Sequence, residues 1–387
     1  MLAVGSEAVA SSPARLTQPA SFGRVAVVHD WLTGMRGGEA VLEAILDVVP
    51  EAELFTLFHF AGSVSKQIES RVIHTSRLQP MATHVGDYRR LLPLFPQAAR
   101  AWDFRQFDLI ISSSHCVAKG VNARGLPHLC YCHTPMRYIW DRFDDYFPPS
   151  KPLLRLGANV VAPYLRRWDV RTAGEVTKFV ANSHFVQERI ARYYGRESEV
   201  IHPFVDDAFL VAPLNKTRED FDVVVSALVP YKHVELAIET AVVTGRRLVV
   251  IGGGPMLVHL RERAKERAGL DIELMGSVSR EVIIDVVSRA RSLILPGIED
   301  FGITPLEGMA LGTPVVALRG GGVLDTVIEG VNGVLFEQPV VESLAEALHV
   351  AGTRVWDRHA IRARAAQFSR GRFVEQFRAA LGSTVRQ

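Results

Sequence analysis

The sequence predicts an α/β protein built from two Rossmann-like domains. Short apolar runs recur along the chain, and most of them lead into a polar or glycine-containing loop and then a segment of helical periodicity. Residues 24–29 open this pattern in the first half, and residues 221–226 open it in the second. The G-x-G-x-x-G pattern of nicotinamide-binding domains is missing, because Gly34, Gly37 and Gly38 are spaced differently. We therefore expect two parallel sheets whose ligand-binding edges face each other across a cleft.

Composition and charge limit the classes of function. The chain has 387 residues, of which 48% are hydrophobic and 22% charged, as in globular proteins of two domains. Its formal net charge of +2 argues against a general nucleic-acid binder. The cysteines are Cys116, Cys130 and Cys132, and the last two alternate along an apolar run. Because Cys-x-Cys without further ligands is no metal pattern, we expect these two to be core residues. The small number of cysteines, in a chain without an export signal, predicts a reduced, cytosolic protein.

Changes in composition divide the chain. Residues 1–22 are rich in Ala, Ser and Pro without an apolar stretch of signal-peptide length, which predicts a disordered tail. Residues 23–206 should form an N-terminal domain, residues 207–218 a linker and residues 219–365 a C-terminal domain. Residues 366–387 are predicted to form a final helix. No window offers the roughly 18 uncharged apolar residues that a membrane span needs.

The first domain should begin with a strand, a loop and a helix. Gly37 and Gly38 stand at the predicted helix start, where free backbone amides attract anions. Both would let a diphosphate approach closely, although a tight turn is the alternative explanation. His29 and Asp30 end the first strand and form a polar pair at the same edge of the sheet.

A denser polar cluster follows the strand predicted over residues 128–132. His133 comes directly after this strand, and Arg137, Tyr138 and Asp141 follow it closely. Because ligands bind beyond the carboxyl ends of strands in open α/β sheets, His133 is expected to face the cleft. A single histidine is more often a core or surface residue, and this alternative stays open at the level of sequence.

The second domain repeats this order with a lysine in its first loop. Lys232 could neutralise a departing diphosphate, on whose oxygen negative charge builds up. The alternative is a surface lysine, which the dipole disfavours at a helix start. Asp220 and Asp222 have the spacing of a metal-binding pair, but they stand at the wrong end of the predicted strand. We therefore interpret them as structural residues and predict no metal.

Residues 296–307 contain the main candidate ligand-binding groups of the second domain. They follow a buried apolar strand, and Thr304 with Pro305 forms a helix-start signal. Glu299 then lies at the strand's carboxyl end and Glu307 in the first helical turn, where both can accept hydrogen bonds from a polyol. The free amides between them, which can bind anions and hydroxyl oxygens, belong to Phe301, Gly302 and Ile303. Thr304 and Glu307 also match a capping box, which is the structural alternative for Glu307.

This stretch resembles the signature of the retaining glycosyltransferases of family 4, which have the GT-B fold. Seven residues separate Glu299 from Glu307, with Phe301-Gly302 between them and Pro305-Leu306 before the second glutamate. The resemblance runs from about Arg24 to the C-terminus, and it implies that the final helix packs back on the first domain.

The family resemblance also implies roles for the candidate residues. Glu299 would hold the donor sugar, Glu307 the nucleotide ribose, and the amides of residues 301–303 the sugar and phosphate. His133 would contact the donor sugar near the reacting centre. Further donor contacts would come from the loop or strand-end backbone at four positions: Gly37, Gly38, Gly276 and Val278. The family pairs its lysine with an arginine, but Ala227 stands where that arginine is often found, and His233 is one candidate replacement.

A narrower branch of the family is similar to residues 112–121 and residues 133–138. Its members act in bacterial polysaccharide or O-antigen assembly, and many are mannosyltransferases that use GDP-mannose. The resemblance implies metal-independent transfer of a hexose from a nucleotide diphosphate sugar to a glycan or a polyprenyl-diphosphate-linked acceptor, with no other cofactor. The nearest rival is a nucleotide-sugar 2-epimerase of the same fold. A non-catalytic module that binds sugar nucleotides or membranes is the rival from another class.

One basic region predicts contact with a membrane surface. Residues 71–171 contain 15 Lys or Arg against 7 Asp or Glu. Residues 88–96 and residues 164–168 interleave basic, aromatic and aliphatic side chains, a mixture that suits anionic headgroups. Ordinary helices with solvated arginines are the alternative. The predicted location is cytoplasmic, with peripheral contact at the inner face of the cell membrane.

Overall fold

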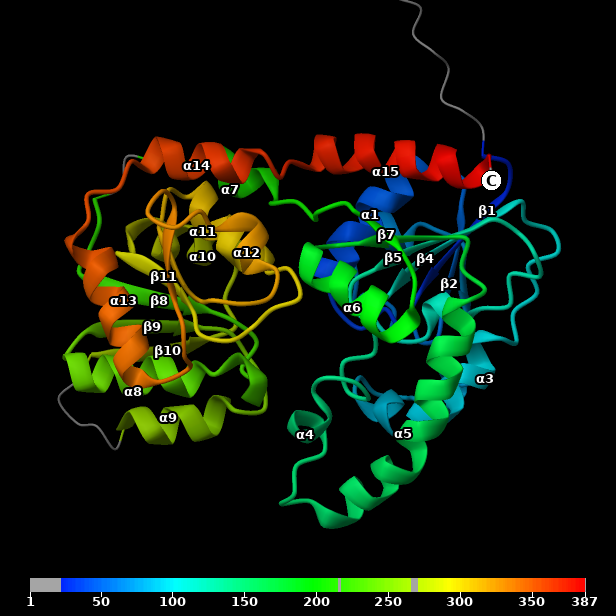
Figure 1. Ribbon diagram of the computed structural model, residues 1–387, viewed down its shortest axis with the longest axis horizontal. Helices are drawn as coiled ribbons and strands as arrows, with labels where there is room; N and C mark the ends of the chain where they lie inside the picture. Colours follow the sequence, from blue (N-terminus) through cyan, green and yellow to red (C-terminus); the bar gives the residue numbers. More distant parts are fainter. Residues whose placement is uncertain (1–21, 215–216, 266–270, 387) are drawn as a thin grey trace, which may run out of the picture.

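The computed structural model describes residues 22–214, 217–265 and 271–386, which form two α/β domains lying side by side (Figure 1). The first domain contains a seven-stranded sheet of order β3-β2-β1-β4-β5-β6-β7. The second contains a six-stranded sheet of order β10-β9-β8-β11-β12-β13. All neighbouring strands are parallel. The prediction of two Rossmann-like domains with parallel sheets is confirmed.

The strands are short and the central ones are buried, as expected for parallel sheets covered on both faces. All five residues of β1 are buried, and so are all four of β11. The strands of the first sheet are β1 (Val25–His29), β2 (Glu53–Thr56), β3 (Ile73–Thr75), β4 (Leu109–Ser114), β5 (His128–Cys132), β6 (Lys178–Ala181) and β7 (Ser198–Val200). Those of the second are β8 (Phe221–Val225), β9 (Arg247–Ile251), β10 (Ile272–Gly276), β11 (Ser292–Leu295), β12 (Val315–Leu318) and β13 (Gly333–Phe336).

Helices connect these strands and pack against the sheets (Figure 1). The helices of the first half are α1 (Gly37–Val48), α2 (Lys66–Glu69), α3 (Phe95–Ala99), α4 (Phe143–Tyr146), α5 (Pro152–Ala173), α6 (His184–Tyr194) and α7 (Asp207–Val211). Those of the second half are α8 (Val234–Thr244), α9 (Leu257–Lys265), α10 (Arg280–Arg289), α11 (Ile303–Ala310), α12 (Val323–Thr326), α13 (Val341–Thr353), α14 (Arg358–Ala366) and α15 (Arg370–Val385). Within the ranges that the structure describes, no helix has the length and apolar character needed to cross a membrane.

The chain passes between the domains twice. After β7 it enters α7, whose Phe209 is buried in the core of the second domain, so the segment predicted as a linker carries a packed helix. After α14 it returns, and α15 places Phe373 against Tyr131 of the first sheet with ring centroids 5.6 Å apart. The two crossings touch where the Val205 amide donates to the Phe368 carbonyl oxygen at 3.0 Å. Residues 1–21 of the predicted tail lie outside the described residues.

Both segments predicted to interleave basic and aromatic residues contribute most of their aromatic side chains to the core. Tyr88 and Phe95 are buried beside Trp31, and Trp168 is buried on α5. Their prediction as surface groups is wrong, because each ring faces the body of the first domain; Tyr164 alone among the aromatic residues of these two segments is exposed. Cys130 and Cys132 are buried free cysteines, as predicted.

The strand orders fix where loops can form a ligand site. Each sheet has a switch point, a pair of central strands from which the chain winds outward in both directions. In the first sheet these strands are β1 and β4, and in the second they are β8 and β11. The loops that follow such a pair separate and leave a crevice at the carboxyl ends of the strands.

Candidate active site

Lys232 and Glu299 meet at the switch point of the second sheet. Lys232 lies in the loop after β8 and Glu299 in the loop after β11, and their side chains form an ion pair. The loops can approach because Gly297 has no side chain; a Cβ there would lie 2.7 Å from the Tyr231 carbonyl oxygen. Burial, the largest cause, and the charge of Arg137 lower the pKa of Lys232 to about 7. The contact with Glu299 acts in the opposite direction and favours the ammonium.

The loop between Glu299 and α11 leaves part of its backbone unpaired within the described part of the chain. The amides of Phe301, Gly302 and Ile303 find no hydrogen-bond acceptor among the described residues. The Phe301 side chain is buried and contacts His202, so only its backbone is available to a ligand. Gly302 has φ +87°, which a residue with a side chain rarely adopts. Three neighbouring amides without partners at a helix start are suited to an anion or to sugar hydroxyls.

Glu307 lies in α11 with a free carboxylate. The helix starts at Ile303, one residue before the predicted signal, because the turn at Gly302 already brings the chain into helical geometry. Glu307 is therefore in the second turn, not the first, and the capping box with Thr304 is not formed. Burial, with a smaller contribution from Asp206, raises the pKa of Glu307 to about 7. Its carboxylate has no hydrogen-bond partner in the described part of the chain, which leaves it available to ligand hydroxyls.

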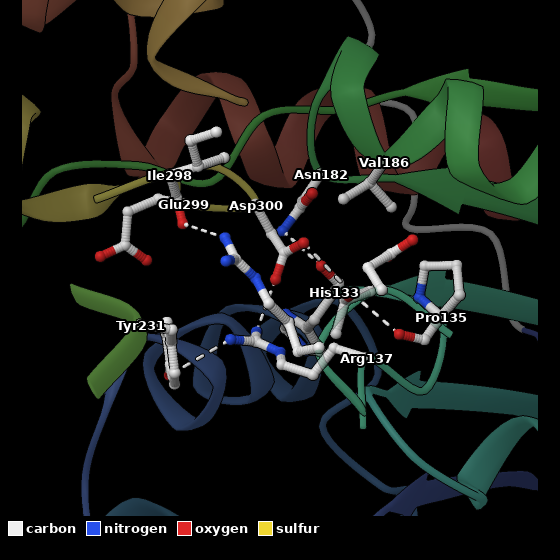
Figure 2. Close-up of polar contacts among 12 residues, drawn as sticks. His133, Pro135, Arg137, Asn182, Val186, Tyr231, Ile298, Glu299 and Asp300 are labelled. Atoms are coloured by element: carbon white, nitrogen blue, oxygen red, sulfur yellow. Dashed lines mark hydrogen bonds and ion pairs between the residues drawn. The ribbon is translucent and has the colours of Figure 1, made fainter. Parts of the chain in front are cut away.

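Asp300 joins the second domain to the first. Its carboxylate accepts from Arg137 at 2.5 Å (Figure 2). It also accepts from Arg189 at 2.5 Å and from the Thr134 hydroxyl at 3.2 Å. Ser183 also donates to its carbonyl oxygen at 2.5 Å. Arg189 also forms an ion pair with Asp141, so the two arginines face two carboxylates at the domain junction. The sequence analysis missed Asp300 and Arg189; the position of Asp300 beside Glu299 was the only available signal.

The first domain contributes a cluster of three histidines, of which His29 is buried and His115 and His133 are half-buried. His133 Nε2 lies 2.8 Å from the Ser113 hydroxyl, which is 3.0 Å from His29 Nδ1. The ring centroids of His29, His115 and His133 are 6.1 to 6.5 Å apart. Burial and the neighbouring histidines lower the pKa of His133 to about 3. At neutral pH its imidazole is therefore uncharged and can exchange hydrogen bonds with a sugar hydroxyl without adding charge.

Gly37 and Gly38 bring this cluster to the donor loop. A Cβ on Gly37 would lie 2.7 Å from the Ile303 side chain, and a Cβ on Gly38 would lie 3.9 Å from the rings of His133 and His29. The start of α1 therefore lies between the two predicted halves of the site. A larger residue at Gly37 would require the Ile303 side chain to move.

Gly276 and Val278 lie farther along the second sheet. Gly276 ends β10, and its carbonyl oxygen accepts from the Gly252 amide at 2.8 Å. Val278 packs at the margin of the second core, in the same cluster as Ile303. Both are at the carboxyl edge, although the structure shows no contact of either with the Lys232–Glu299 pair. Asp222, at the opposite edge, is buried and pairs with Arg246 at 2.7 Å, which fits its structural interpretation.

Cations from the first domain lie beside Tyr231, the residue before Lys232. The Ala227 side chain is exposed, whereas Arg137 and Arg142 each lie 5.7 Å from the centroid of the Tyr231 ring. Figure 2 shows Arg137 between Tyr231 and Asp300. His233, the replacement considered from sequence, forms a turn with φ +50°, and burial lowers its pKa. Arg137 and Arg142 are permanently charged, so they are better placed to complement Lys232.

Comparison with known proteins matches both halves of the chain. The family Glycosyltransferase Family 4 matches residues 54–209, and the family Glycosyl transferases group 1 matches residues 207–366. An O-antigen chain mannosyltransferase C of Escherichia coli is 27% identical over 183 residues, or 46% of this chain and 48% of that protein. A GDP-mannose-dependent alpha-(1-6)-phosphatidylinositol monomannoside mannosyltransferase of Mycolicibacterium smegmatis is 31% identical over 201 residues, or 45% and 52%. The chain spans about half the length of the curated relatives it matches.

Solved structures share the whole fold. HepE of Anabaena in complex with UDP aligns with a TM-score of 0.68 at 18% identity, covering 93% of this chain and 100% of that one. Sucrose-phosphate synthase from Thermosynechococcus elongatus aligns with a TM-score of 0.67 at 18% identity, covering 92% and 97%. The family matches meet where the chain first passes between the domains. This chain therefore belongs to the GT-B glycosyltransferases that combine a family 4 domain with a group 1 domain.

Proposed function

We propose that this chain is a retaining hexosyltransferase that moves mannose from GDP-mannose to a glycan or a polyprenyl-diphosphate-linked acceptor in bacterial polysaccharide synthesis. The observation that carries the proposal is the meeting of Lys232 and Glu299 at one switch point, with His133 at the edge of the other sheet. The two mannosyltransferase relatives support the choice of sugar, and the printed name of one includes GDP-mannose.

Lys232 would stabilise the leaving group. When the bond between the anomeric carbon and phosphate oxygen breaks, the electron pair departs with the nucleoside diphosphate. Without ligand, Glu299 holds Lys232, whose pKa burial lowers to about 7. An arriving diphosphate favours the charged ammonium and releases Glu299 to accept hydrogen bonds from the sugar. Lys232 and Glu299 thus exchange one ion pair for two contacts with the donor.

Arg137 and Arg142 would supply the second cation that Ala227 does not. Both belong to the first domain and face Tyr231, the residue before Lys232. Arg137 pairs with Asp300 at 2.5 Å and Arg142 with Asp145 at 3.4 Å, so the diphosphate would compete with these carboxylates for both cations. The diphosphate would then be fully stabilised only when the two domains are together, which couples domain closure to bond breaking and limits hydrolysis of the donor by water.

The remaining groups would hold the rest of the donor. Glu307 has an unpaired carboxylate for the two ribose hydroxyls. The free amides of residues 301–303 would bind sugar or phosphate oxygens. His133 is uncharged and hydrogen-bonded to Ser113, so it would orient a sugar hydroxyl. The acceptor hydroxyl would attack the anomeric carbon and pass its proton to the departing phosphate oxygen.

The test measures hydrolysis and transfer with purified protein and a panel of nucleotide sugars, with and without a bacterial lipid extract. We expect turnover of GDP-mannose, and we expect Lys232→Ala to lower it about 100-fold or more, the effect of losing one stabilising group at a developing charge. Glu299→Gln should lower turnover similarly. The matched control is Lys66→Ala, which removes an exposed lysine of α2 and should leave turnover unchanged.

Other outcomes would replace the proposal. Turnover of another nucleotide sugar alone would keep the enzyme class but reject mannose. An epimerised donor in the absence of acceptor would identify a nucleotide-sugar 2-epimerase. Tight donor binding without turnover, even with lipid extract, would identify a non-catalytic module. Equal activity of Lys232→Ala and Lys66→Ala would reject the role given to Lys232.

A further inference from the structure

The first half of α5 carries apolar side chains in solvent. In Figure 1 the start of α5 extends downward, away from the sheet of the first domain. Leu153 is 85% exposed, Leu156 63% and Val160 73%. With Tyr164, which is also exposed, they recur every three or four positions and therefore form one stripe along the helix. Exposed apolar groups aligned in this way indicate a surface that is covered by something else.

The same stripe becomes basic closer to the domain. Arg167 and Arg171 stand on the next two turns and are exposed. The only acidic residue of α5 is Asp169, which is buried and pairs with Lys119 at 2.9 Å. The exposed stripe is therefore apolar at the end of the helix, positive at its base and free of negative charge. This distribution complements a surface that has apolar material beneath anionic groups.

A short connection links this helix to the candidate active site. Tyr146, at the end of α4, stacks on Tyr231 with ring centroids 6.3 Å apart, and Tyr231 precedes Lys232. The negative charge of Asp144 on α4 is offset by Arg155 of α5 at 2.7 Å. Whatever α5 contacts thus lies close to the opening of the cleft.

We propose that the docking stripe, formed by Leu153, Leu156, Val160, Tyr164, Arg167 and Arg171, binds this protein to the surface of an anionic lipid bilayer. The apolar side chains would enter the boundary between headgroups and acyl chains, and the two arginines would contact lipid phosphates. This inference goes beyond the proposed function, because it requires no particular donor or acceptor. It also gives the predicted membrane contact a defined surface, distinct from residues 88–96.

A second copy of the chain fits the docking stripe less well. Antiparallel pairing of two α5 helices would set Leu153 of one copy against Arg171 of the other. Parallel pairing would bring the four arginines together, and like charges repel. A bilayer avoids both conflicts. Its apolar layer can take the side chains at the start of α5, while its anionic headgroups contact the arginines nearer the domain.

The test is sedimentation of the full chain with vesicles of phosphatidylcholine, with or without phosphatidylglycerol, in the absence of donor. The chain should bind vesicles that contain phosphatidylglycerol, more weakly as salt rises. The triple variant Leu153→Ser, Leu156→Ser, Val160→Ser should lower the partition coefficient about tenfold or more, and Arg167→Gln with Arg171→Gln should remove the preference for anionic lipid. The matched control is Val243→Ser, Val258→Ser, Val355→Ser, three exposed valines in the second domain.

Several results would overturn the proposal. The docking stripe is not the membrane surface if the triple variant and its valine control bind vesicles equally. If the unaltered chain and the valine control form a dimer in analytical ultracentrifugation and the triple variant does not, the stripe binds a second copy. Donor turnover in solution should be the same in the triple variant and the unaltered chain, because none of these residues belongs to the candidate active site. A failure of membrane binding is thereby separated from a failure of the proposed transferase activity.

Discussion

The switch points of the two sheets differ in how many of their polar groups are already paired. In the first sheet, the Asp30 carboxylate accepts hydrogen bonds from four backbone amides in residues 115–118, at 2.6 to 2.8 Å. In the second sheet, Glu307 and the amides of residues 301–303 have no partner in the described part of the chain. At the edge of the first sheet, the protein itself thus satisfies the hydrogen bonds of the loop beside the histidines. At the edge of the second sheet, unpaired groups are left for a ligand. Three measurements test this difference between the two sheets.

The largest effect is expected from Asp30→Ala. The change leaves four buried amides without an acceptor, and each such group costs about 1–3 kcal/mol. Because the loop can relax toward water, we expect the free energy of unfolding of the first domain to fall by about 3 kcal/mol in urea titrations. Asp103→Ala is the control, since Asp103 is fully exposed and its loss should leave the unfolding transition nearly unchanged. Equal stability of both variants would mean that the first edge does not depend on Asp30.

A smaller effect is expected from Glu307→Gln. The raised pKa means that the unliganded protein disfavours the carboxylate, so this group's contribution to stability falls as pH rises from its ordinary pKa to about 7. Donor binding should show the opposite trend, because the carboxylate accepts ribose hydroxyls better than the neutral acid does. We expect GDP affinity to increase about tenfold as pH rises through the pKa, and this increase to be absent in Glu307→Gln.

Calorimetric titration of GDP at several pH values makes this comparison. The variant corrects for the titration of GDP itself, since only the difference between the two proteins is used. Parallel pH profiles would show that Glu307 does not touch the nucleotide, and the contrast between the two edges would lose its main support.

The smallest effect is expected at the junction of Asp325 with His184 and His202. Burial alone would raise the pKa of Asp325, but hydrogen bonds from His202 and from the His184 amide outweigh it and lower the pKa. The resulting stabilisation is present above the ordinary pKa of a carboxyl group and is lost as pH falls through the lowered value. Because His184 is exposed, Asp325→Asn should cost less than about 1 kcal/mol.

Acid unfolding of this variant, with Asp271→Asn as an exposed control, measures that difference. The side chains of Asp325, His184 and His202 also have ligand atoms within 4.8 Å of one another. Adding zinc should nevertheless leave the Tm unchanged if the cluster only joins the domains. A rise in Tm that Asp325→Asn abolishes would contradict the prediction that no metal is bound.

The sequence predicts the place of those site residues that directly follow a strand of a parallel sheet. Lys232 and Glu299 each follow an apolar strand, and parallel strands bring their carboxyl ends to one edge, so their proximity could be expected. The same reasoning placed His133 and Gly38 at the edge of the first sheet. None of these expectations required a knowledge of how the two domains face each other.

Sequence was uninformative where distant segments meet. Asp30 binds amides 85 or more residues away, and nothing in its local pattern indicates that partner. The contacts of Asp300 with Arg137 and Arg189 depend on the relative placement of two domains, which no periodicity encodes. The start of α11 was misplaced because Thr304-Pro305 is a strong local signal, whereas the turn at Gly302 is set by packing of the surrounding loops.

The return of α15 to the first domain also orders events during translation. Phe373, Phe377 and Leu381 belong to the same buried cluster as strands β1 and β5, yet they are synthesised after every strand of the second domain. During synthesis, the apolar surface of the first domain that packs against α15 therefore stays uncovered until these residues emerge from the ribosome. At about 5–20 residues per second that delay lasts of the order of ten seconds or more. Chaperones would meet this enzyme with its first half nearly folded and its last helix still missing.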